Sequence, residues 1–300
     1  MGEASKIQWT TSTFNPWIGC TKVSAGCENC YAEVNRFVTI RRAQGRELWG
    51  PKAERHIVSE AKWREVRQWN ELAKKSGEPW RVFCASLADV FEDRDVLAAP
   101  RARLFELIEA TPALTWMLLT KRPENMTTMA PAAWRSGWPR NIWALTTVED
   151  QKQAELRIPE LQRVPAEVLG LSAEPLLGPL DLRRWLQFEC HHEDGYVEYD
   201  TNALICRECE SLGMINWLII GGESGPEARP FDLAWARSLI AQCREAGVAP
   251  FFKQAGAHPI DGRPDCTREW WQAQRLRLRD RMGGDLSELP EGLRVREWPR

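Results

Sequence analysis

The chain has 300 residues, with 43% hydrophobic and 27% charged residues and a formal net charge of −2. This length and balance predict a folded protein with one large α/β domain or two ordinary ones. No stretch approaches the roughly 20 apolar residues of a membrane span, and the net charge gives no overall attraction to nucleic acid. The N-terminus has no apolar export segment, so we expect a cytoplasmic location. In that compartment, clustered cysteines bind metal or act in catalysis more often than they form disulfides.

The first feature along the chain is a loop with three cysteines, Cys20, Cys27 and Cys30, in the spacing C-x6-C-x2-C. The residues alone leave two interpretations open. A zinc site would need a fourth ligand from elsewhere, such as His56 or Cys84, to complete its tetrahedron. An iron–sulfur cluster could instead be held through three of its irons, which leaves the fourth iron open to a ligand.

Beyond this loop, short apolar runs alternate with longer amphipathic stretches. Continuous apolar runs of strand length predict strands that are buried on both faces of a parallel sheet, and the longer stretches predict helices. The alternation predicts an α/β fold, specifically a TIM-like (β/α) barrel in complete or partial form. The expected strands are Arg81–Ser86, Thr115–Thr120, Asn141–Thr146, Val168–Ser172, Ile215–Ile220 and Val248–Phe252, and the expected helices are Val96–Thr111 and Phe231–Gly247.

Polar residues follow nearly every predicted strand. The carboxyl ends of the strands in a (β/α) barrel meet on one face, where active sites form, so we expect these residues to converge. The alternative is that strand ends are polar in any fold, and that the paired glycines only make a tight turn. The residues are Ser86, Asp89, Lys121, Arg122, Glu149, Glu174, Gly221, Gly222, Glu223, Lys253 and Gln254.

A second metal site is predicted between two of the strands, from Cys190, His192, Cys206 and Cys209. Four soft ligands that include a C-x2-C pair are typical of a small zinc ribbon, and zinc would fold a segment with little core of its own. Loose surface residues are the alternative. We therefore expect a barrel over residues 1–258, interrupted by a zinc-binding insert at 188–212, and an irregular, partly helical extension over 259–300.

Several motifs together resemble the phage-associated three-Cys-motif proteins, a family of unknown function that is a divergent relative of the radical S-adenosylmethionine (SAM) superfamily. The resemblance covers the chain from about Trp9 to Gly256. The motifs are Trp9-Thr-x-x-Thr13-x-Asn15-Pro16-x-x-Gly19-Cys20, Cys27, Cys30-Tyr31-Ala32, Leu119-Thr-Lys-Arg-Pro123, Ser172-Ala-Glu-Pro-Leu-Leu-Gly-Pro179, Gly221-Gly-Glu-Ser-Gly-Pro226, Ala228-Arg229-Pro230 and Phe252-Lys-Gln254. One departure is that the common radical SAM loop is C-x3-C-x2-C with an aromatic residue before the last cysteine, whereas Tyr31 here follows Cys30.

The resemblance implies a [4Fe–4S] cluster on the three cysteines that binds SAM at its open iron. The reduced cluster would cleave SAM to methionine and a 5′-deoxyadenosyl radical, which takes a hydrogen atom from the substrate. The implied cofactor contacts are Tyr31, Ser86, Asp89, Glu149, Gly221, Gly222 and Glu223. The implied catalytic residues are Lys121, Glu174 and Lys253, and the implied substrate contacts are Arg122, Arg229 and Gln254.

The implied substrate is nucleic acid, with repair of DNA lesions or base modification as the reaction. The implied partners are an electron donor such as flavodoxin or ferredoxin and a further partner protein. Two other classes stay open. One is a zinc-binding phage accessory or nucleic-acid-binding protein without redox chemistry. The other is a metal-assisted hydrolase that uses the carboxylates Asp89, Glu149, Glu174 and Glu223.

Overall fold

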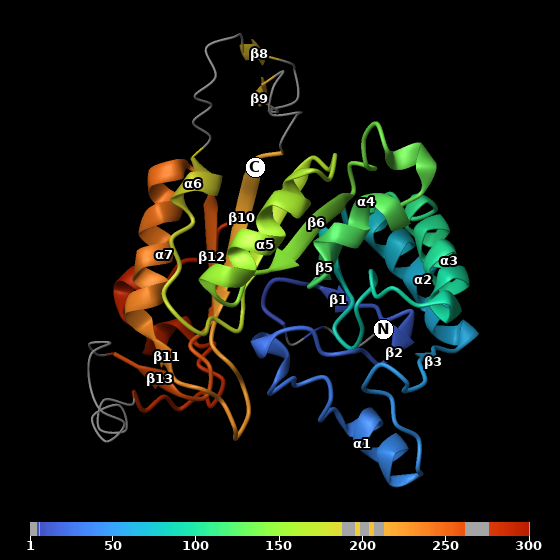
Figure 1. Cartoon of the computed structure of the whole chain (residues 1–300), viewed down its shortest axis with the longest axis horizontal. Coiled ribbons are helices and arrows are strands. Elements are labelled where there is room, and N and C mark those ends of the chain that lie inside the picture. Colours follow the sequence, from blue (N-terminus) through green and yellow to red (C-terminus); the bar gives the residue numbers. More distant parts are fainter. Residues whose placement is uncertain are drawn as a thin grey trace. The chain divides into compact units, whose positions relative to one another are not determined.

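The computed structural model describes residue 5 and residues 7–187, 213–261 and 276–299, together with two short strands between residues 196 and 206. The chain divides into two compact units (Figure 1). The first comprises Met1–Leu145 and Val164–Glu167, and the second comprises Thr146–Arg163 and Val168–Arg300. No helix in the part of the chain that the structure describes is long and apolar enough to cross a membrane.

Parallel strands form the centre of the first unit. Strand β4 pairs with β1 on one side and with β5 on the other, with Val82 opposite both Ser12 and Trp116. Strand β6 begins in this unit, and its last two residues belong to the second. A separate antiparallel ribbon pairs β2 with β3. The bounds are β1 Ser12–Thr13, β2 Trp17–Ile18, β3 His56–Ile57, β4 Trp80–Cys84, β5 Leu114–Thr120 and β6 Ile142–Thr147.

Helices of the first unit lie beside these strands (Figure 1). Along α2, the buried residues Trp63, Val66, Trp69 and Ala73 recur every three or four positions, which gives the helix one apolar face for packing. The helix ends at Gly77, whose φ of 69° is the left-handed conformation that glycine adopts most easily. The helices are α1 Arg36–Ala43, α2 Glu60–Ser76, α3 Ala98–Glu109 and α4 Met126–Met129.

The second unit has its own parallel strands, with β10 between β7 and β12. Helix α7 starts at Asp232, whose side chain accepts a 2.8 Å hydrogen bond from the Ala234 amide, and it ends at Gly247. Two further pairs are short: β11 with β13, and β8 with β9. The bounds are β7 Val168–Ala173, β8 Tyr196–Glu198, β9 Leu204–Cys206, β10 Ile215–Gly221, β11 Phe231–Asp232, β12 Ala249–Gln254, β13 Pro259–Ile260, α5 Gln151–Gln162, α6 Arg183–Leu186 and α7 Leu233–Ala246.

Residues 286–299, called the C-terminal strap below, cover the edge of β12 that faces away from β10. The Phe252 amide donates to the Val295 carbonyl at 2.8 Å, and the Glu297 amide donates to the Pro250 carbonyl at 2.9 Å. The Trp298 ring stacks on Trp217 with a centroid separation of 5.2 Å. The strap therefore protects an edge strand that would otherwise expose unpaired backbone groups.

The predicted elements are confirmed to within a few residues. All six expected strands are present as β4, β5, β6, β7, β10 and β12, and the two expected helices as α3 and α7. The strands are parallel and accompanied by helices, so the α/β class is confirmed. The TIM-like barrel stays a prediction. The expected zinc-binding insert at 188–212 lies outside the described residues except for β8 and the backbone of β9, so it too stays a prediction.

Candidate functional site

The cysteine loop of the first unit is tied to its neighbours through the backbone. The Gly19 amide donates to the Leu87 carbonyl at 3.0 Å, and the Gly50 amide donates to the Cys20 carbonyl at 3.0 Å. Gly19 has a φ of 120°, and a Cβ atom there would lie 2.5 Å from the Leu48 carbonyl oxygen. Only glycine fits such a close approach without displacing the neighbouring backbone.

Two of the three thiols lie against a small apolar cluster. Cys20 and Cys30 both pack against it, and its buried members are Ile18, Ala32, Val38, Leu48 and Trp49. Burial raises the pKa of the Cys20 thiol to about 12, and it raises the pKa of Cys30 as well. Thiolates at these positions therefore need compensating charge or hydrogen bonds, which a bound metal group would supply together with the neighbouring donors.

Each sulfur has its own polar neighbours. Arg122 Nη1 lies 3.9 Å from Cys20 Sγ, and Ser24 Oγ lies 4.0 Å from Cys27 Sγ. The Cys30 thiol is close to the backbone amides of two residues that follow it and to the charge of Lys121, all of which oppose the rise in its pKa. Donors of this kind stabilise thiolate ligands and tune the potential of iron–sulfur clusters.

Asp89 organises the end of β5 next to the cysteines. Its carboxylate accepts hydrogen bonds from Thr120 Oγ1 at 2.6 Å, the Lys121 amide at 3.1 Å, Arg122 Nη1 at 2.7 Å and the Phe91 amide at 3.0 Å. Burial opposes the charge of Arg122, but Asp89 and other anionic neighbours hold the pKa of its guanidinium above its usual value. Both Asp89 oxygens are thus engaged within the protein. This geometry favours a positioning role over the predicted contact with the cofactor.

Arg122 links Asp89 to the cysteine loop. Besides its contact with Cys20, it donates through Nη2 to the Thr21 carbonyl at 2.7 Å. The resemblance implies that Arg122 contacts the substrate, and a strand-end arginine is a common anion contact. In the structure its side chain is 10% exposed and faces the cysteines.

Arg55 is a residue of the candidate site that the sequence did not indicate. Its side chain is 0% exposed and pairs with Glu92 through two hydrogen bonds, Nε to Oε2 at 2.8 Å and Nη2 to Oε1 at 2.6 Å. It also donates to Thr21 Oγ1 at 2.8 Å and to the Leu48 carbonyl at 3.1 Å. Arg55 thus fixes the residue after Cys20. No periodic pattern or motif around Arg55 could have indicated this.

Tyr31 and Ser86, which the resemblance implies as cofactor contacts, are joined through a backbone atom of Ser86. Tyr31 Oη donates to the Ser86 carbonyl at 2.8 Å, and Asn15 Nδ2 donates to Ser86 Oγ at 3.1 Å. The tyrosine remains 47% exposed. Its ring is therefore held beside the cysteine loop while part of it stays open to solvent.

In the second unit, Glu174 follows β7 and lies against Lys253 at the end of β12. Lys253 Nζ is 2.5 Å from Glu174 Oε1, and the two side chains are 13% and 16% exposed. A Cβ atom at Gly221 would lie 3.2 Å from the Glu174 side-chain Cδ, so the glycine leaves room for this pair. The predicted catalytic residues Glu174 and Lys253 are thus in direct contact.

The neighbouring loop after β10 holds a second group of predicted residues. Glu223 Oε2 accepts from the Arg229 amide at 2.8 Å and from Arg229 Nε at 3.0 Å. Gln254 Nε2 donates to the Gly222 carbonyl at 3.1 Å, while Gln254 Oε1 is buried with no hydrogen-bond partner among the described residues. An unsatisfied buried acceptor of this kind calls for a donor, such as a water molecule or a ligand.

Glu149, which the resemblance implies as a cofactor contact, is 0% exposed. Arg157 Nη1 donates to Glu149 Oε2 at 2.7 Å and to the Thr147 carbonyl at 2.9 Å. A carboxylate enclosed in this way holds α5 to the end of β6, so the geometry favours a structural role.

All four carboxylates proposed for a hydrolytic metal site have cationic partners in the structure. Within the described residues, no three side chains of the types histidine, cysteine, aspartate and glutamate lie close enough to hold one metal ion. Carboxylates that already pair with guanidinium or ammonium groups are poor candidates for ligands. The pairs are Asp89 with Arg122, Glu149 with Arg157, Glu174 with Lys253 and Glu223 with Arg229.

The absence of such a group among the described residues also concerns the three cysteines, because they are of the searched types. A single zinc ion needs its ligands to converge on one point, at about 2.3 Å from each sulfur. A cubane cluster binds each cysteine to a different iron, so its ligands need not converge. The second predicted metal site cannot be compared, because Cys190, His192 and Cys209 lie outside the described residues and Cys206 is described only as the last residue of β9.

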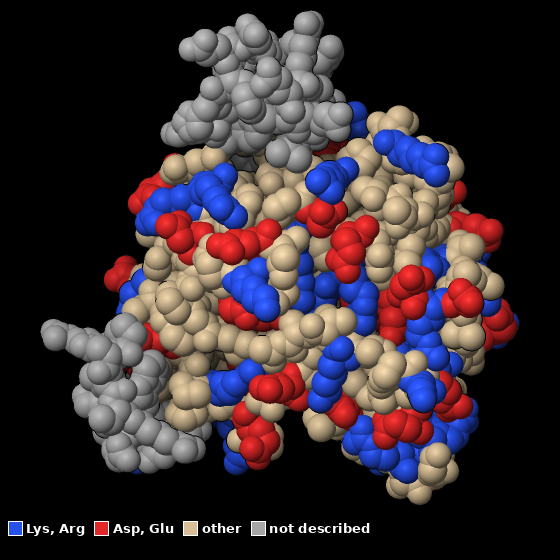
Figure 2. Space-filling model, viewed as in Figure 1, with Lys and Arg blue, Asp and Glu red and all other residues tan. Residues whose placement is uncertain are grey.

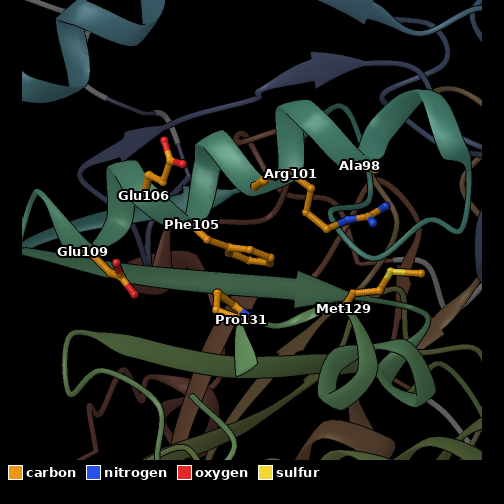
Figure 3. Close-up of a pocket in the computed structure, with 8 residues that line it drawn as sticks. Ala98, Arg101, Phe105, Glu106, Glu109, Met129 and Pro131 are labelled. Carbon is orange, nitrogen blue, oxygen red and sulfur yellow. The ribbon is translucent and has the colours of Figure 1, made fainter. Parts of the chain in front are cut away.

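A surface hollow of about 420 Å³ lies in the first unit between α3 and the segment after α4 (Figure 3). Its lining includes Arg101, Phe105, Glu109 and Met129. Arg101 donates to the Val90 carbonyl at 2.8 Å, and Glu109 accepts from a tryptophan side chain at 2.7 Å, so both charged groups are engaged. None of the predicted site residues lines this hollow, and we assign it no function.

The family to which the chain belongs is shown by its sequence. Residues 4–285 match DUF5131, which is described as a protein of unknown function. The chain belongs to the DUF5131 family. Comparisons with curated proteins and with solved structures found no match. The family description assigns no activity, so the function of this DUF5131 protein has to be inferred from its residues and their geometry.

Proposed function

We propose that this DUF5131 protein is a radical-SAM-type iron–sulfur enzyme in which Cys20, Cys27 and Cys30 hold a [4Fe–4S] cluster. The observation that carries the proposal is the cysteine loop itself. Its three thiols stand on one tightly tied loop, two of them pack against an apolar cluster, and each has polar neighbours suited to a thiolate. Three cysteine ligands leave one iron of such a cluster open.

When bound, such a cluster supplies one electron that cleaves SAM and yields a 5′-deoxyadenosyl radical. The protein's own residues would hold and tune that chemistry. Arg122 directs a donor at Cys20 Sγ and is itself fixed by Asp89. The apolar cluster covers part of Cys20 and Cys30, and this partial burial would strengthen the hydrogen bonds that their sulfurs accept.

Two groups of residues are proposed to contact SAM or the substrate. In the first unit, the partly exposed Tyr31 ring, held by its bond to Ser86, offers a surface on which a nucleobase can stack. In the second unit, the contact between Glu174 and Lys253 offers an acid–base pair. Lys253 would donate a proton to a developing anion, and Glu174 would orient the ammonium group.

For the substrate we propose nucleic acid, acted on through repair of DNA lesions or base modification. The proposal is supported by the resemblance to phage-associated proteins and by Lys121 at the end of β5, a strand-end cation. Lys253 and Arg229 pair with carboxylates, so Lys121 is the better candidate for a phosphate contact. Binding of short DNA at low salt tests this assignment, because phosphate contacts are strongest there. Wild-type protein that shows no DNA binding at low salt would exclude it.

The cofactor is tested by anaerobic reconstitution, followed by iron, sulfide and zinc analysis and by EPR of the dithionite-reduced protein with and without SAM. The proposal predicts about four irons per chain and an EPR signal that SAM alters. A Cys27→Ala variant should lose the iron, whereas Cys243→Ala, at a buried cysteine of α7, should keep it. Zinc alone after reconstitution would refute the proposal and favour a zinc-binding accessory protein.

A further inference from the structure

The C-terminal strap reaches the predicted catalytic residues of the second unit through one side chain, Arg296. Its Nη2 atom donates to the Lys253 carbonyl at 3.0 Å and to the Gly284 carbonyl at 2.7 Å. Its Nε atom donates to the Phe252 carbonyl at 3.2 Å, and the guanidinium lies 5.7 Å from the centre of the Phe251 ring. One planar group therefore joins the last residues of β12 to a segment much later in the chain.

A second set of contacts holds the residues that follow β12. The Ala255 amide donates to the Gly283 carbonyl at 2.8 Å, and the Gly256 amide donates to the Met282 carbonyl at 3.0 Å. Gly283 has a φ of 65°, and a Cβ atom there would lie 2.9 Å from the Ala255 Cβ atom, so the two segments approach closely. The end of β12 and the two residues after it are thus held by the C-terminal part of the chain.

The held stretch carries Lys253, one member of the ion pair with Glu174. The segment after Glu174 is tied to β10 in turn, because the Leu176 amide donates to the Gly221 carbonyl at 2.9 Å. Both members of the pair are therefore fixed through the backbone. Their separation depends on where Arg296 places the backbone of Lys253.

This pair differs from the ion pairs on the surface. Basic and acidic side chains are interspersed on the face of the molecule in Figure 2, and exposed pairs of this kind contribute little to stability. Lys253 and Glu174 are only 13% and 16% exposed. Since water replaces a lost partner poorly at such a position, the relative placement of the two groups matters more there.

We propose that Arg296 is a positioning residue: by fixing the backbone at Lys253, it keeps the ammonium group against Glu174. The catalytic use of this contact rests on the proposed function, in which Lys253 donates a proton. The placement of the ammonium group itself requires no cluster. Arg296 lies outside residues 4–285, the part of the chain that matches the family, so neither the family match nor a sequence motif indicates this role.

Protection of the strand edge does not account for the Arg296 side chain. The edge of β12 is covered by the backbone pairing of Phe252 with Val295 and by the packing of Trp298 on Trp217. A guanidinium presents several donors in a fixed plane, whereas an ammonium group is a compact charge on a flexible stem. Arginine is therefore suited to bridge two separate carbonyls, which is what Arg296 does.

The first experiment measures how fast an amine-acylating reagent modifies Lys253, by mass spectrometry of the full chain before any cluster is reconstituted. Held against a carboxylate, the ammonium group is shielded from the reagent. Arg296→Ala should speed the modification at least about fivefold, as expected when a contact between coupled residues is lost. Lys152, which is exposed on α5, is the internal reference. An unchanged Lys253 rate in Arg296→Ala would overturn the proposal.

Two further variants separate positioning from a general loosening of the strap. Arg294→Ala removes a strap arginine whose bonds go to carbonyls within the strap, and it should leave the Lys253 rate unchanged. Trp298→Ala loosens the packing of the strap and should change the Lys253 rate less than Arg296→Ala does. Urea denaturation of all three variants gives their stabilities. Lys253 rates that simply follow the loss of stability would overturn the proposal in favour of a structural role.

A double-mutant cycle tests whether Arg296 acts through the ion pair. Glu174→Gln removes the carboxylate charge and should itself speed the modification of Lys253. In that background Arg296→Ala should add less than about twofold, because the contact that it positions is already lost. A full additional effect would overturn the proposal. No iron after reconstitution would refute the proposed function and the catalytic use of the pair, whereas the Lys253 rates would still decide whether Arg296 positions the ammonium group.

Discussion

Arg55 and Glu92 form a buried ion pair that contacts the cysteine loop at Thr21. The two side chains are 0% and 4% exposed, so a charge left alone there has no access to water. A Glu92→Ala variant should lose about 3–5 kcal/mol of unfolding free energy, since it leaves the guanidinium buried and unpaired. Urea denaturation measures this loss. Glu60→Ala, which breaks the exposed pair with Arg103, should cost at most about 1 kcal/mol. A smaller loss for Glu92→Ala than for Glu60→Ala would contradict a stabilising role of the buried pair between Arg55 and Glu92.

His56 reports the charge near α1. Burial and two arginines lower the pKa of its imidazole, so the folded protein favours the neutral form more than the unfolded chain does. This part of the stability is therefore complete above the unfolded pKa and is lost as the pH falls through the lower, folded pKa. NMR titration should place the His56 pKa below its ordinary value, and Arg41→Gln should raise it. Lys152→Gln, on α5, should leave it unchanged, and an unchanged pKa in Arg41→Gln would contradict an effect of the Arg41 charge on this imidazole.

The conformation of the cysteine loop depends on one glycine, Gly19. Gly19→Ala would place a Cβ atom 2.5 Å from the Leu48 carbonyl oxygen at a φ of 120°. We expect a loss of about 1–3 kcal/mol of unfolding free energy and a lower iron content after reconstitution, because the loop has to shift. Gly137→Ala, where a Cβ atom would meet nothing within 4 Å, is the control and should change neither quantity. Normal stability and full iron content in Gly19→Ala would show that the loop tolerates the shift.

The elements of the fold were predictable where hydrophobic pattern alone decides them. The run Ile215–Ile220 is apolar enough to require burial on both faces, and the structure has β10 at Ile215–Gly221. Two-residue strands such as β2 leave no such pattern, because pairing with β3 decides them. The site residues likewise divide into those that the sequence pattern indicates and those that only contacts in the folded chain reveal. Strand ends pointed to Glu174 and Lys253, but the pairing of Arg122 with Cys20 or of Arg55 with Glu92 depends on contacts between distant parts of the chain.

At the scale of the folded chain, the C-terminal strap completes the second unit. Trp298 packs against Trp217 and Phe251, with centroid separations of 5.2 Å in both cases. A Trp298→Ala variant should lose about 2–4 kcal/mol of unfolding free energy, somewhat less than a fully buried tryptophan. It should also aggregate more readily, because the edge of β12 becomes less well covered. Urea denaturation and light scattering measure the two effects. Met282→Ala, at a side chain 45% exposed, is the control, and equal behaviour of the two variants would contradict this role of the strap.

The strap also has a consequence during synthesis on the ribosome. The residues that cover the edge of β12 come later in the chain than the strand itself, since Phe252 pairs with Val295. The ribosome therefore makes β12 well before it makes its cover. At about 5–20 residues per second, the gap of about 40 residues leaves that edge uncovered for a few seconds in every new chain. During this interval the newly made second unit presents open backbone donors and acceptors to other nascent chains. Slow translation between the codons for Phe252 and Val295 should therefore increase aggregation of this protein more than slow translation of residues before β12.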